Sequence, residues 1–213
     1  MASRTALAVA ARYAQYLPRE VEAVAADLDS FCELLTKWNR TQNLVSRETD
    51  ELWQRHIGDS LQLVRFIRPT DRQCADLGSG GGFPALPLAV ALKGSGRSHL
   101  LIEANAKKSS FLRAAIRELG LDARVESSRA EAIKLPSSPD LVTARAVAPL
   151  DVLIRLSAPL LAAGGRALFH KGREYDEELR AAADHWRFDV IQHASDTDSE
   201  AVILDIRNIS PRL

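Results

Sequence analysis

Hydrophobic residues in the first third of the chain recur at helical spacing. Residues 20 to 38 place an apolar side chain on one face every three or four positions, and residues 50 to 66 repeat that pattern after a polar loop at 39 to 47. Residues 1 to 17 fit a short amphipathic helix better than a targeting peptide. The sequence therefore predicts that this part of the chain is helical.

The pattern changes at residue 73, where short apolar runs begin to alternate with helical stretches. Strands are expected at 74–77, 99–102, 124–126, 141–143 and 167–170, and helices at 84–92, 106–119, 149–161 and 174–186. Strands separated by helices form βαβ units, which assemble into a parallel sheet with right-handed crossovers. We therefore expect a Rossmann-like, doubly wound α/β core at 73–213, one compact unit, preceded by a helical extension at 1–72.

The end of the chain departs from this alternation. Two β-rich runs, 187–193 and 201–209, are separated only by the turn-like residues 194–200. A link this short cannot hold a crossover helix, so the two strands should be antiparallel. The otherwise parallel sheet should therefore contain one reversed strand.

Composition and charge narrow the class of protein. The 213 residues are 46% hydrophobic and 26% charged, and the two cysteines, Cys32 and Cys74, have no C-x-x-C partner, so we expect reduced, buried thiols and no metal site. No apolar run approaches the roughly 20 residues of a membrane span. The sequence thus predicts a soluble, cytoplasmic protein, and no apolar stripe requires it to be more than a monomer.

The formal net charge is zero, which argues against attachment to nucleic acid by bulk electrostatics alone. The charges are unevenly distributed, however. Residues 73–173 contain 14 basic and 8 acidic residues, whereas residues 174–213 contain 4 and 10. The positive charge is therefore concentrated in the middle segment, where the candidate chemistry also lies.

A glycine-rich turn follows the first predicted strand. Glycines between residues 78 and 82 permit a tight strand-to-helix turn and let a ligand approach the backbone at the helix N-terminus. The spacing is G-x-G-x-G when it is counted from Gly78, but G-x-G-x-x-A when it is counted from Gly80 to Ala85, which a dinucleotide site would also accept. The glycines alone leave both cofactor types open.

Glu103 ends the second predicted strand, roughly 20 residues after the turn. An acid at this place accepts hydrogen bonds from the two ribose hydroxyls of an adenosine. Because both cofactor types contain adenosine, Glu103 supports an adenosine cofactor without choosing between them.

Several short motifs occur in a fixed order along the chain. They are Trp38-Asn39-x-x-x-Asn43-Leu44, Arg55-His56-Ile57-x-Asp59-Ser60, Asp76-Leu77-Gly78-Ser79-Gly80-Gly81-Gly82-Phe83-Pro84, Ser128-Arg129-Ala130-Glu131, Ala144-Arg145-Ala146 and Lys171-Gly172. In this order the sequence resembles the bacterial small-subunit ribosomal RNA guanine-N7 methyltransferases. The resemblance implies a class I methyltransferase fold, S-adenosyl-L-methionine as cofactor, and methylation of N7 of guanine 527 in 16S rRNA, presented as RNA or as the small ribosomal subunit.

The same resemblance assigns residues to the site. Those expected at the cofactor are Asp76, Gly78, Gly80 and Phe83 in the turn, Glu103 at the ribose, Ala130 and Glu131 at the adenine, and Arg145 where the methyl group meets the substrate. Arg145 is also the expected catalytic residue. Guanine N7 already carries a lone pair, so transfer needs in-line approach and no general base, and we expect no catalytic histidine or cysteine.

The remaining polar residues receive more general roles. N7 must stay free to attack, so we expect Arg145 to engage O6 or a phosphate. Lys171, Arg173 and Lys107 are expected at RNA phosphates. His56 is interpreted as a helix-surface or packing residue near Asp59, and the pair Asn39 and Asn43 as helix-capping residues.

Three other functions remain open from the sequence. A methyltransferase acting on a small molecule or a protein would share the fold. An NAD-dependent oxidoreductase would use the second glycine spacing. A non-catalytic ribosome-assembly factor would bind RNA and retain the cofactor pocket without turnover.

Overall fold

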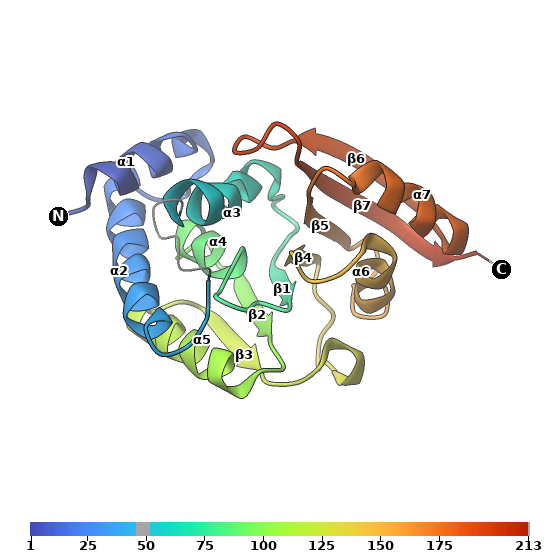
Figure 1. Ribbon diagram of the computed structural model, residues 1–213, viewed down its shortest axis with the longest axis horizontal. Coiled ribbons are helices and arrows are strands. Elements are labelled where there is room, and N and C mark those ends of the chain that lie inside the picture. The colour runs from blue at the N-terminus through green and yellow to red at the C-terminus, as the bar shows by residue number, and fades with distance from the viewer. Residues whose placement is uncertain (46–51, 213) are drawn as a thin grey trace.

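The computed structural model describes residues 1–45 and 52–212, and its strands form one sheet in the order β3-β2-β1-β4-β5-β7-β6 (Figure 1). The strands are β1 Gln73–Leu77, β2 Ser98–Ile102, β3 Ala123–Glu126, β4 Leu141–Arg145, β5 Arg166–Lys171, β6 Trp186–Ala194 and β7 Val202–Pro211. β7 pairs antiparallel with both β5 and β6, and the remaining pairs are parallel. The prediction of a mostly parallel sheet with one reversed strand is confirmed.

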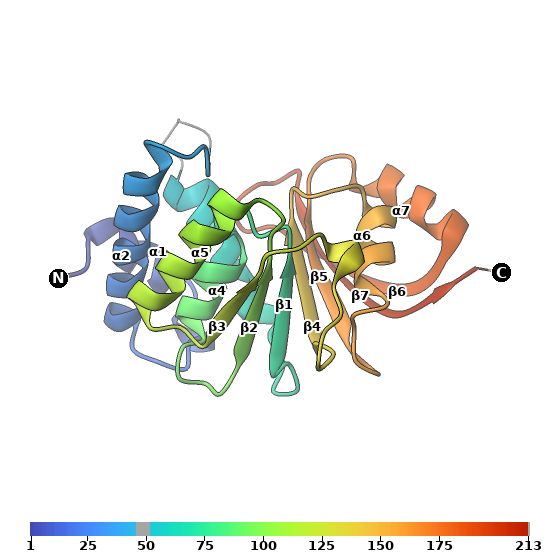
Figure 2. The same cartoon turned by 90° about the horizontal axis from the view of Figure 1, so that it is seen from below.

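Helices cover both faces of this sheet (Figure 2). They are α1 Arg4–Ala11, α2 Val21–Asn39, α3 Asp59–Leu61, α4 Ala85–Ala91, α5 Ala106–Leu119, α6 Leu150–Ser157 and α7 Tyr175–His185. α1, α2, α4 and α5 lie on one face, and α6 and α7 lie on the other. In the part of the chain that the structure describes, no helix is long and apolar enough to cross a membrane.

Alternating residues of each central strand face these two helical layers, as expected for a sheet that is buried on both sides. In β1, Cys74 belongs to the hydrophobic cluster under α4 and α5, whereas Ala75 and Leu77 belong to the cluster under α6 and α7. Cys74 and Cys32 are both free and buried, and burial raises the pKa of each thiol to about 12. The expectation of reduced, buried thiols is confirmed.

The helical extension shares its hydrophobic core with the sheet region. Phe31 of α2 lies 5.5 Å from Phe83 and 6.4 Å from Phe111 between ring centroids, and Trp38 lies 5.8 Å from Phe111. The boundary expected at residue 73 therefore separates two stretches of sequence whose side chains pack in one cluster.

The second predicted helix is not a single regular helix. A π-helix, η3 Leu52–Gly58, leads into the short α3 and then into a 3-10 helix, η4 Gln62–Phe66, while residues 50 and 51 lie outside the described residues. Gly58 favours helix poorly, and the Ser60 hydroxyl donates 2.6 Å to the carbonyl of His56, where it competes with the backbone ladder. π-Helical turns are frequent at functional sites, and this one carries His56.

Candidate active site

The glycine-rich turn after β1 requires glycine at particular positions. Gly78, Gly80 and Gly82 all have left-handed backbones, with φ of +62°, +55° and +91°. A Cβ on Gly82 would lie 2.4 Å from Leu86 Cδ1, and a Cβ on Gly81 would lie 2.9 Å from the carbonyl oxygen of Leu44. The turn is therefore closely packed, and the loop after α2 lies directly against it.

Glu103 closes this turn from the end of β2. One carboxylate oxygen accepts a hydrogen bond from the Gly80 amide at 2.8 Å, and the other accepts from the Asn105 amide at 2.7 Å. Each carboxylate oxygen retains a second lone pair for a ribose hydroxyl. Glu103 is thus in direct contact with the glycine-rich turn.

Asp76 is a buried carboxylate beneath the turn. Its Oδ1 accepts a hydrogen bond from Thr143 Oγ1 at 2.6 Å, whereas its buried Oδ2 has no hydrogen-bond partner among the described residues. Burial is the main cause that raises the pKa of Asp76 to about 7. A cationic ligand at this place would supply the missing partner and stabilise the carboxylate.

The connection after β4 lies against the same turn. A Cβ on Gly78 would meet Val147 Cγ2 at 2.9 Å, and Ala146 has a φ of +55°. A left-handed conformation is costly for a residue other than glycine and concentrates at functional sites. This strained connection places the end of β4 beside the candidate cofactor site.

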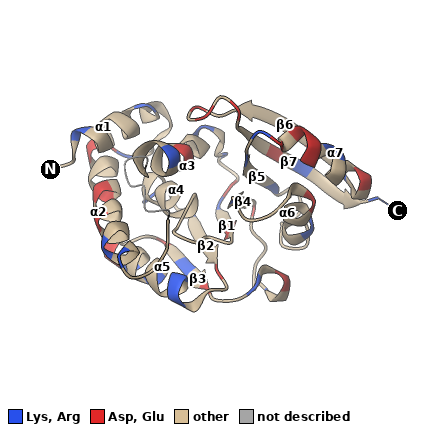
Figure 3. Ribbon diagram, in the orientation of Figure 1, with Lys and Arg blue, Asp and Glu red and all other residues tan. Residues whose placement is uncertain are grey.

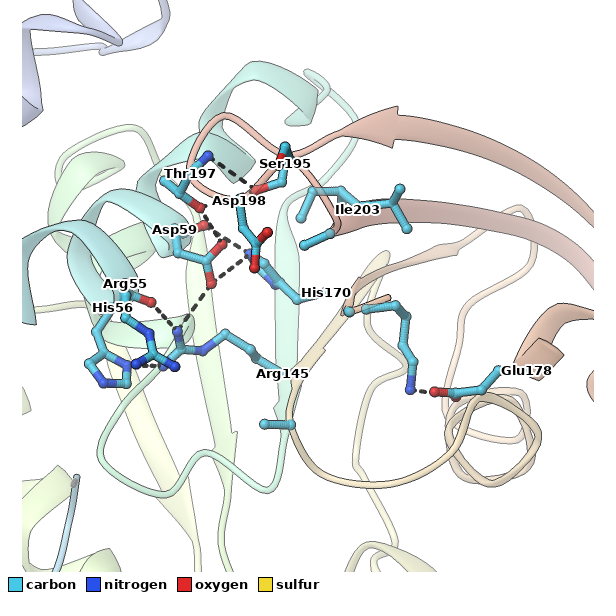
Figure 4. A pocket seen from close by; sticks show the side chains of 16 residues that line it. Arg55, His56, Asp59, Arg145, His170, Glu178, Ser195, Thr197, Asp198 and Ile203 are labelled. Atoms are coloured by element: carbon cyan, nitrogen blue, oxygen red, sulfur yellow. Dashed lines mark hydrogen bonds and ion pairs between the residues drawn. The ribbon is translucent and has the colours of Figure 1, made fainter. Parts of the chain in front are cut away.

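Arg145, the last residue of β4, is held by several partners (Figure 4). Its guanidinium donates 2.7 Å to the carbonyl of Arg55 and 3.1 Å to Asp59 Oδ2, and it lies 2.6 Å from His56 Nδ1. It also lies 5.1 Å from the centroid of the Phe83 ring. The side chain is only 15% exposed, so it is not a solvent-exposed strand-end arginine.

Asp59 and His56, which belong to the N-terminal extension, hold the guanidinium of Arg145 in place. Arginine only donates, so His56 Nδ1 accepts, and the His56 ring lies 5.0 Å from the Phe83 ring. Asp59 Oδ1 accepts from Gln62 at 2.7 Å and from Thr197 at 3.0 Å, which fixes the carboxylate. The motif containing Asp59 drew attention to these residues, but their convergence on Arg145 was not predicted.

A pocket of about 750 Å³ opens beside Arg145. It is lined by η3 and α3, the ends of β4 and β5, α7 and the β6–β7 loop, through Arg55, His56, Asp59, Arg145, Ala146, His170, Lys171, Gly172, Glu178, Ser195, Thr197, Asp198, Ser199, Ala201, Val202 and Ile203 (Figure 4). Its position at the carboxyl ends of parallel strands is the usual place for a ligand in such a sheet. Because Arg145 also lies over the ring of Phe83, the pocket adjoins the glycine-rich turn.

His170 at the base of the pocket is a buried, neutral histidine. Its Nε2 donates 2.8 Å to the carbonyl oxygen of Asp59, and burial lowers its pKa. This contact joins β5 to α3.

The structure gives the other predicted residues different surroundings. Lys171 is 9% exposed and pairs with Glu178 at 2.5 Å, while Arg173 is 76% exposed and Lys107 is exposed in the first turn of α5. Ala130 and Glu131 lie in the 3-10 helix η5, Ala130–Ala132, after β3. Lys171 therefore already has a partner, and the exposed Arg173 pairs with Glu200 at 2.5 Å, so neither is the freely placed cation that the sequence suggested.

The prediction that Asn39 caps a helix is wrong, because the C-cap of α2 is Arg40 and the Asn39 side chain bonds to the loop that follows. Its side-chain oxygen accepts hydrogen bonds from the amides of Leu44 at 2.8 Å and Val45 at 3.1 Å. These bonds order the loop that follows α2, which lies against the glycine-rich turn. Asn43 is exposed within that loop.

The fold and the glycine-rich site define a class I methyltransferase, a class that uses S-adenosylmethionine as methyl donor. Among solved structures, the N-methyltransferase NodS from Bradyrhizobium japonicum in complex with S-adenosyl-L-homocysteine matches with a TM-score of 0.56 and 12% identity, covering 82% of this chain and 98% of that one. The glycopeptide N-methyltransferase MtfA complexed with S-adenosylmethionine matches with a TM-score of 0.57 and 11% identity, covering 71% and 93%. At these identities the likeness concerns the fold.

Sequence relatives identify the family within this class. Residues 24–205 match the GidB family, described as rRNA small subunit methyltransferase G. The ribosomal RNA small subunit methyltransferase G of Bartonella tribocorum is 44% identical, covering 86% of this chain and 87% of the relative, and that of Acidiphilium cryptum is 46% identical, covering 85% and 84%. The chain belongs to this family, and the dinucleotide interpretation of its glycines is wrong.

The residues around the turn fit S-adenosylmethionine. This cofactor carries two positive charges, on its sulfonium and its ammonium groups, and the unpartnered Asp76 oxygen is a buried acceptor suited to a cation. The left-handed glycines leave backbone accessible to a ligand, and the free lone pairs of Glu103 would suit ribose hydroxyls.

Proposed function

We propose that this methyltransferase transfers the methyl group of S-adenosylmethionine to N7 of guanine 527 in 16S rRNA. The observation that carries the proposal is the position of Arg145, whose guanidinium lies over Phe83 of the cofactor turn and also lines the adjoining pocket. A purine in that pocket would lie beside the methyl group. The names of the relatives support rRNA of the small subunit as the substrate class.

The arrangement suits a reaction that needs orientation and no proton transfer. When bound, the cofactor supplies an electrophilic methyl group on a sulfonium, which the N7 lone pair attacks in line as the carbon–sulfur bond breaks. Arg145 uses three of its five N–H groups on Arg55, Asp59 and His56, which leaves two for guanine O6 or a phosphate. His170 remains neutral and positions Asp59.

The residues proposed to hold the cofactor lie at the carboxyl edge of the sheet. Asp76 and the backbone of Gly78, Gly80 and Phe83 would face its methionine part, and Glu103 its ribose. The residues proposed at the adenine are Ala130, which is half-buried, and Glu131, which is exposed.

Lys107 and Arg173 are the proposed phosphate contacts. Basic residues colour α5 and β3 in Figure 3, whereas acids fill the first turn of α7. The salt dependence of subunit binding should lose about one unit of slope in Lys107→Ala. The matched control is Arg180→Ala, which removes an exposed cation from α7 and should leave the slope unchanged. A phosphate contact by Lys171 stays a prediction, and it requires the ion pair between Lys171 and Glu178 to open.

The zero net charge suggests that a folded particle is a better substrate than naked RNA. We propose that the enzyme acts as a monomer in the cytoplasm on the small subunit or an assembly intermediate. Equal turnover of bare transcript and particle would contradict this preference.

Nucleoside analysis tests the proposed reaction. Small subunits from cells that lack the enzyme are incubated with the protein and methyl-labelled S-adenosylmethionine, and their RNA is digested for mass spectrometry. We expect label in N7-methylguanosine, with Arg145→Ala losing more than about tenfold in rate while it retains cofactor affinity. Label in another nucleoside, in protein, or in nothing would contradict the proposal and favour a different methyl acceptor or a non-catalytic factor.

A further inference from the structure

Three acidic residues line the pocket beside Arg145, and two of them are already engaged. Asp59 accepts from Arg145, Gln62 and Thr197. Glu178 accepts from the Leu150 amide at 2.6 Å and pairs with Lys171. These two carboxylates therefore serve the protein's own structure.

The third acid, Asp198 of the β6–β7 loop, is differently placed. Its Oδ1 accepts a hydrogen bond from the Glu200 amide at 2.9 Å, and its Oδ2 has neither a cation nor a hydrogen-bond donor among the described residues. Figure 4 shows the side chain among those that line the pocket. Asp198 therefore presents an acceptor to whatever occupies the pocket.

The loop that carries Asp198 is anchored to the helical extension. The Asp196 amide donates 2.9 Å to Gln62 Oε1, and Gln62 Nε2 donates 3.2 Å to Ser195 Oγ. The hydroxyl of Thr197 donates to Asp59, which also holds Arg145. Asp59 thus bonds both to Arg145 and to Thr197, the residue that precedes Asp198 in the loop.

The edge of guanine carries groups that suit a cation and an acceptor lining one pocket. Around the purine, N7 is followed by O6, an acceptor, and then by N1–H and the N2 amine, which are donors. With N7 at the methyl group and O6 at Arg145, the next edge needs an acceptor. An adenine in the same pose would present its N6 amine to Arg145 and the N1 lone pair to a carboxylate, and both contacts are unfavourable.

We propose that Asp198 determines specificity by accepting hydrogen bonds from N1–H and the N2 amine of the target guanine. The proposal rests on the proposed function and deepens it, because it assigns the selection of guanine to a residue outside the cofactor site. Asp198 touches the substrate base and takes no part in the transfer itself.

Inosine provides the test, because it keeps N7, O6 and N1–H but lacks the N2 amine. Small subunits are reconstituted with guanosine or inosine at the target position, and N7 methylation of each is measured as kcat/KM. A lost hydrogen bond to a charged acceptor should make the wild type prefer guanosine at least about tenfold. The variant Asp198→Asn keeps an oxygen for the Glu200 amide but replaces the free acceptor by a donor, so its preference should fall to within about threefold of unity.

Two further variants control the comparison. Asp198→Ala should lose the preference in the same way, and thermal melting checks that both variants fold. Asp184→Asn removes an exposed acid of α7 outside the pocket and should keep the wild-type preference. Any effect of inosine on RNA folding is common to all the enzymes, so it cancels when the preference of a variant is divided by that of the wild type.

The outcomes separate the proposal from the proposed function. A wild type that methylates both subunits equally, or an Asp198→Asn variant that keeps the full preference, would overturn the role of Asp198 and leave N7 methylation standing. A wild type that places no methyl group on N7 of the guanosine subunit would refute the proposed function, and the role of Asp198 would fall with it.

Discussion

Replacing Asp59 by asparagine tests whether the helical extension positions Arg145. The substitution keeps the size of the side chain and removes the charge 3.1 Å from the guanidinium, at a site where the two side chains are 15% and 16% exposed. At an effective dielectric constant of about 20 the gross attraction is about 5 kcal/mol, and desolvation reduces the net coupling to about 1–2 kcal/mol. We therefore expect kcat/KM to fall about 5- to 30-fold in Asp59→Asn.

A double-mutant cycle gives this prediction its sharpest form. Methylation of small subunits is measured for Asp59→Asn, Arg145→Ala and the double variant. If Asp59 acts through Arg145, the double variant should be no slower than Arg145→Ala alone. Losses that multiply would refute the reasoning, and so would wild-type turnover in Asp59→Asn. Asp184→Asn, an exposed acid on α7, is the control and should match the wild type.

Three further substitutions have outcomes fixed by their surroundings. Burial raises the Asp76 pKa from 3.8 to about 7, so the folded protein holds a proton that the unfolded chain releases. The unfolding free energy of the cofactor-free enzyme should therefore fall as the pH rises from about 4 to about 7, by up to roughly 1.4 kcal/mol per pH unit. Urea titrations of Asp76→Asn at several pH values should lack this slope. Gly82→Ala should lower the unfolding free energy by at least about 2 kcal/mol in urea, because of its positive φ and clash. Arg166→Met should lower it by about 3–5 kcal/mol, since Asp71 and Asp205 would lose their buried cation; values near wild type would contradict each account.

Much of the fold followed from local patterns in the sequence. The strand that ends before Gly78, the helix 106–119 and the closing antiparallel pair depend on periodicity, glycine position and the length of a link, which are all readable locally. The sequence also assigned Glu103 and the glycine-rich turn to one adenosine cofactor, but it did not predict the direct hydrogen bond between Glu103 and Gly80.

The contacts around Arg145 were not predictable in this way. Asp59 and His56 lie 86 and 89 residues before Arg145, and Thr197 lies 138 residues after Asp59, so their meeting depends on how the extension packs on the sheet. Periodicity likewise predicted a regular helix where Gly58 and the Ser60 hydroxyl produce a π-helical turn. The sequence suggested that Lys171 is a free cation, because nothing local indicates that Glu178 lies beside it in the fold.

The central claim is that one guanine of 16S rRNA receives a methyl group on N7. Its most direct test treats RNA from enzyme-methylated small subunits with borohydride and aniline, which cleave the chain at N7-methylguanosine, and then maps the break by primer extension. The account predicts a single new stop at guanine 527 that is absent without enzyme and strongly reduced with Arg145→Ala. A stop at another guanine, or no stop although the cofactor binds, would contradict it.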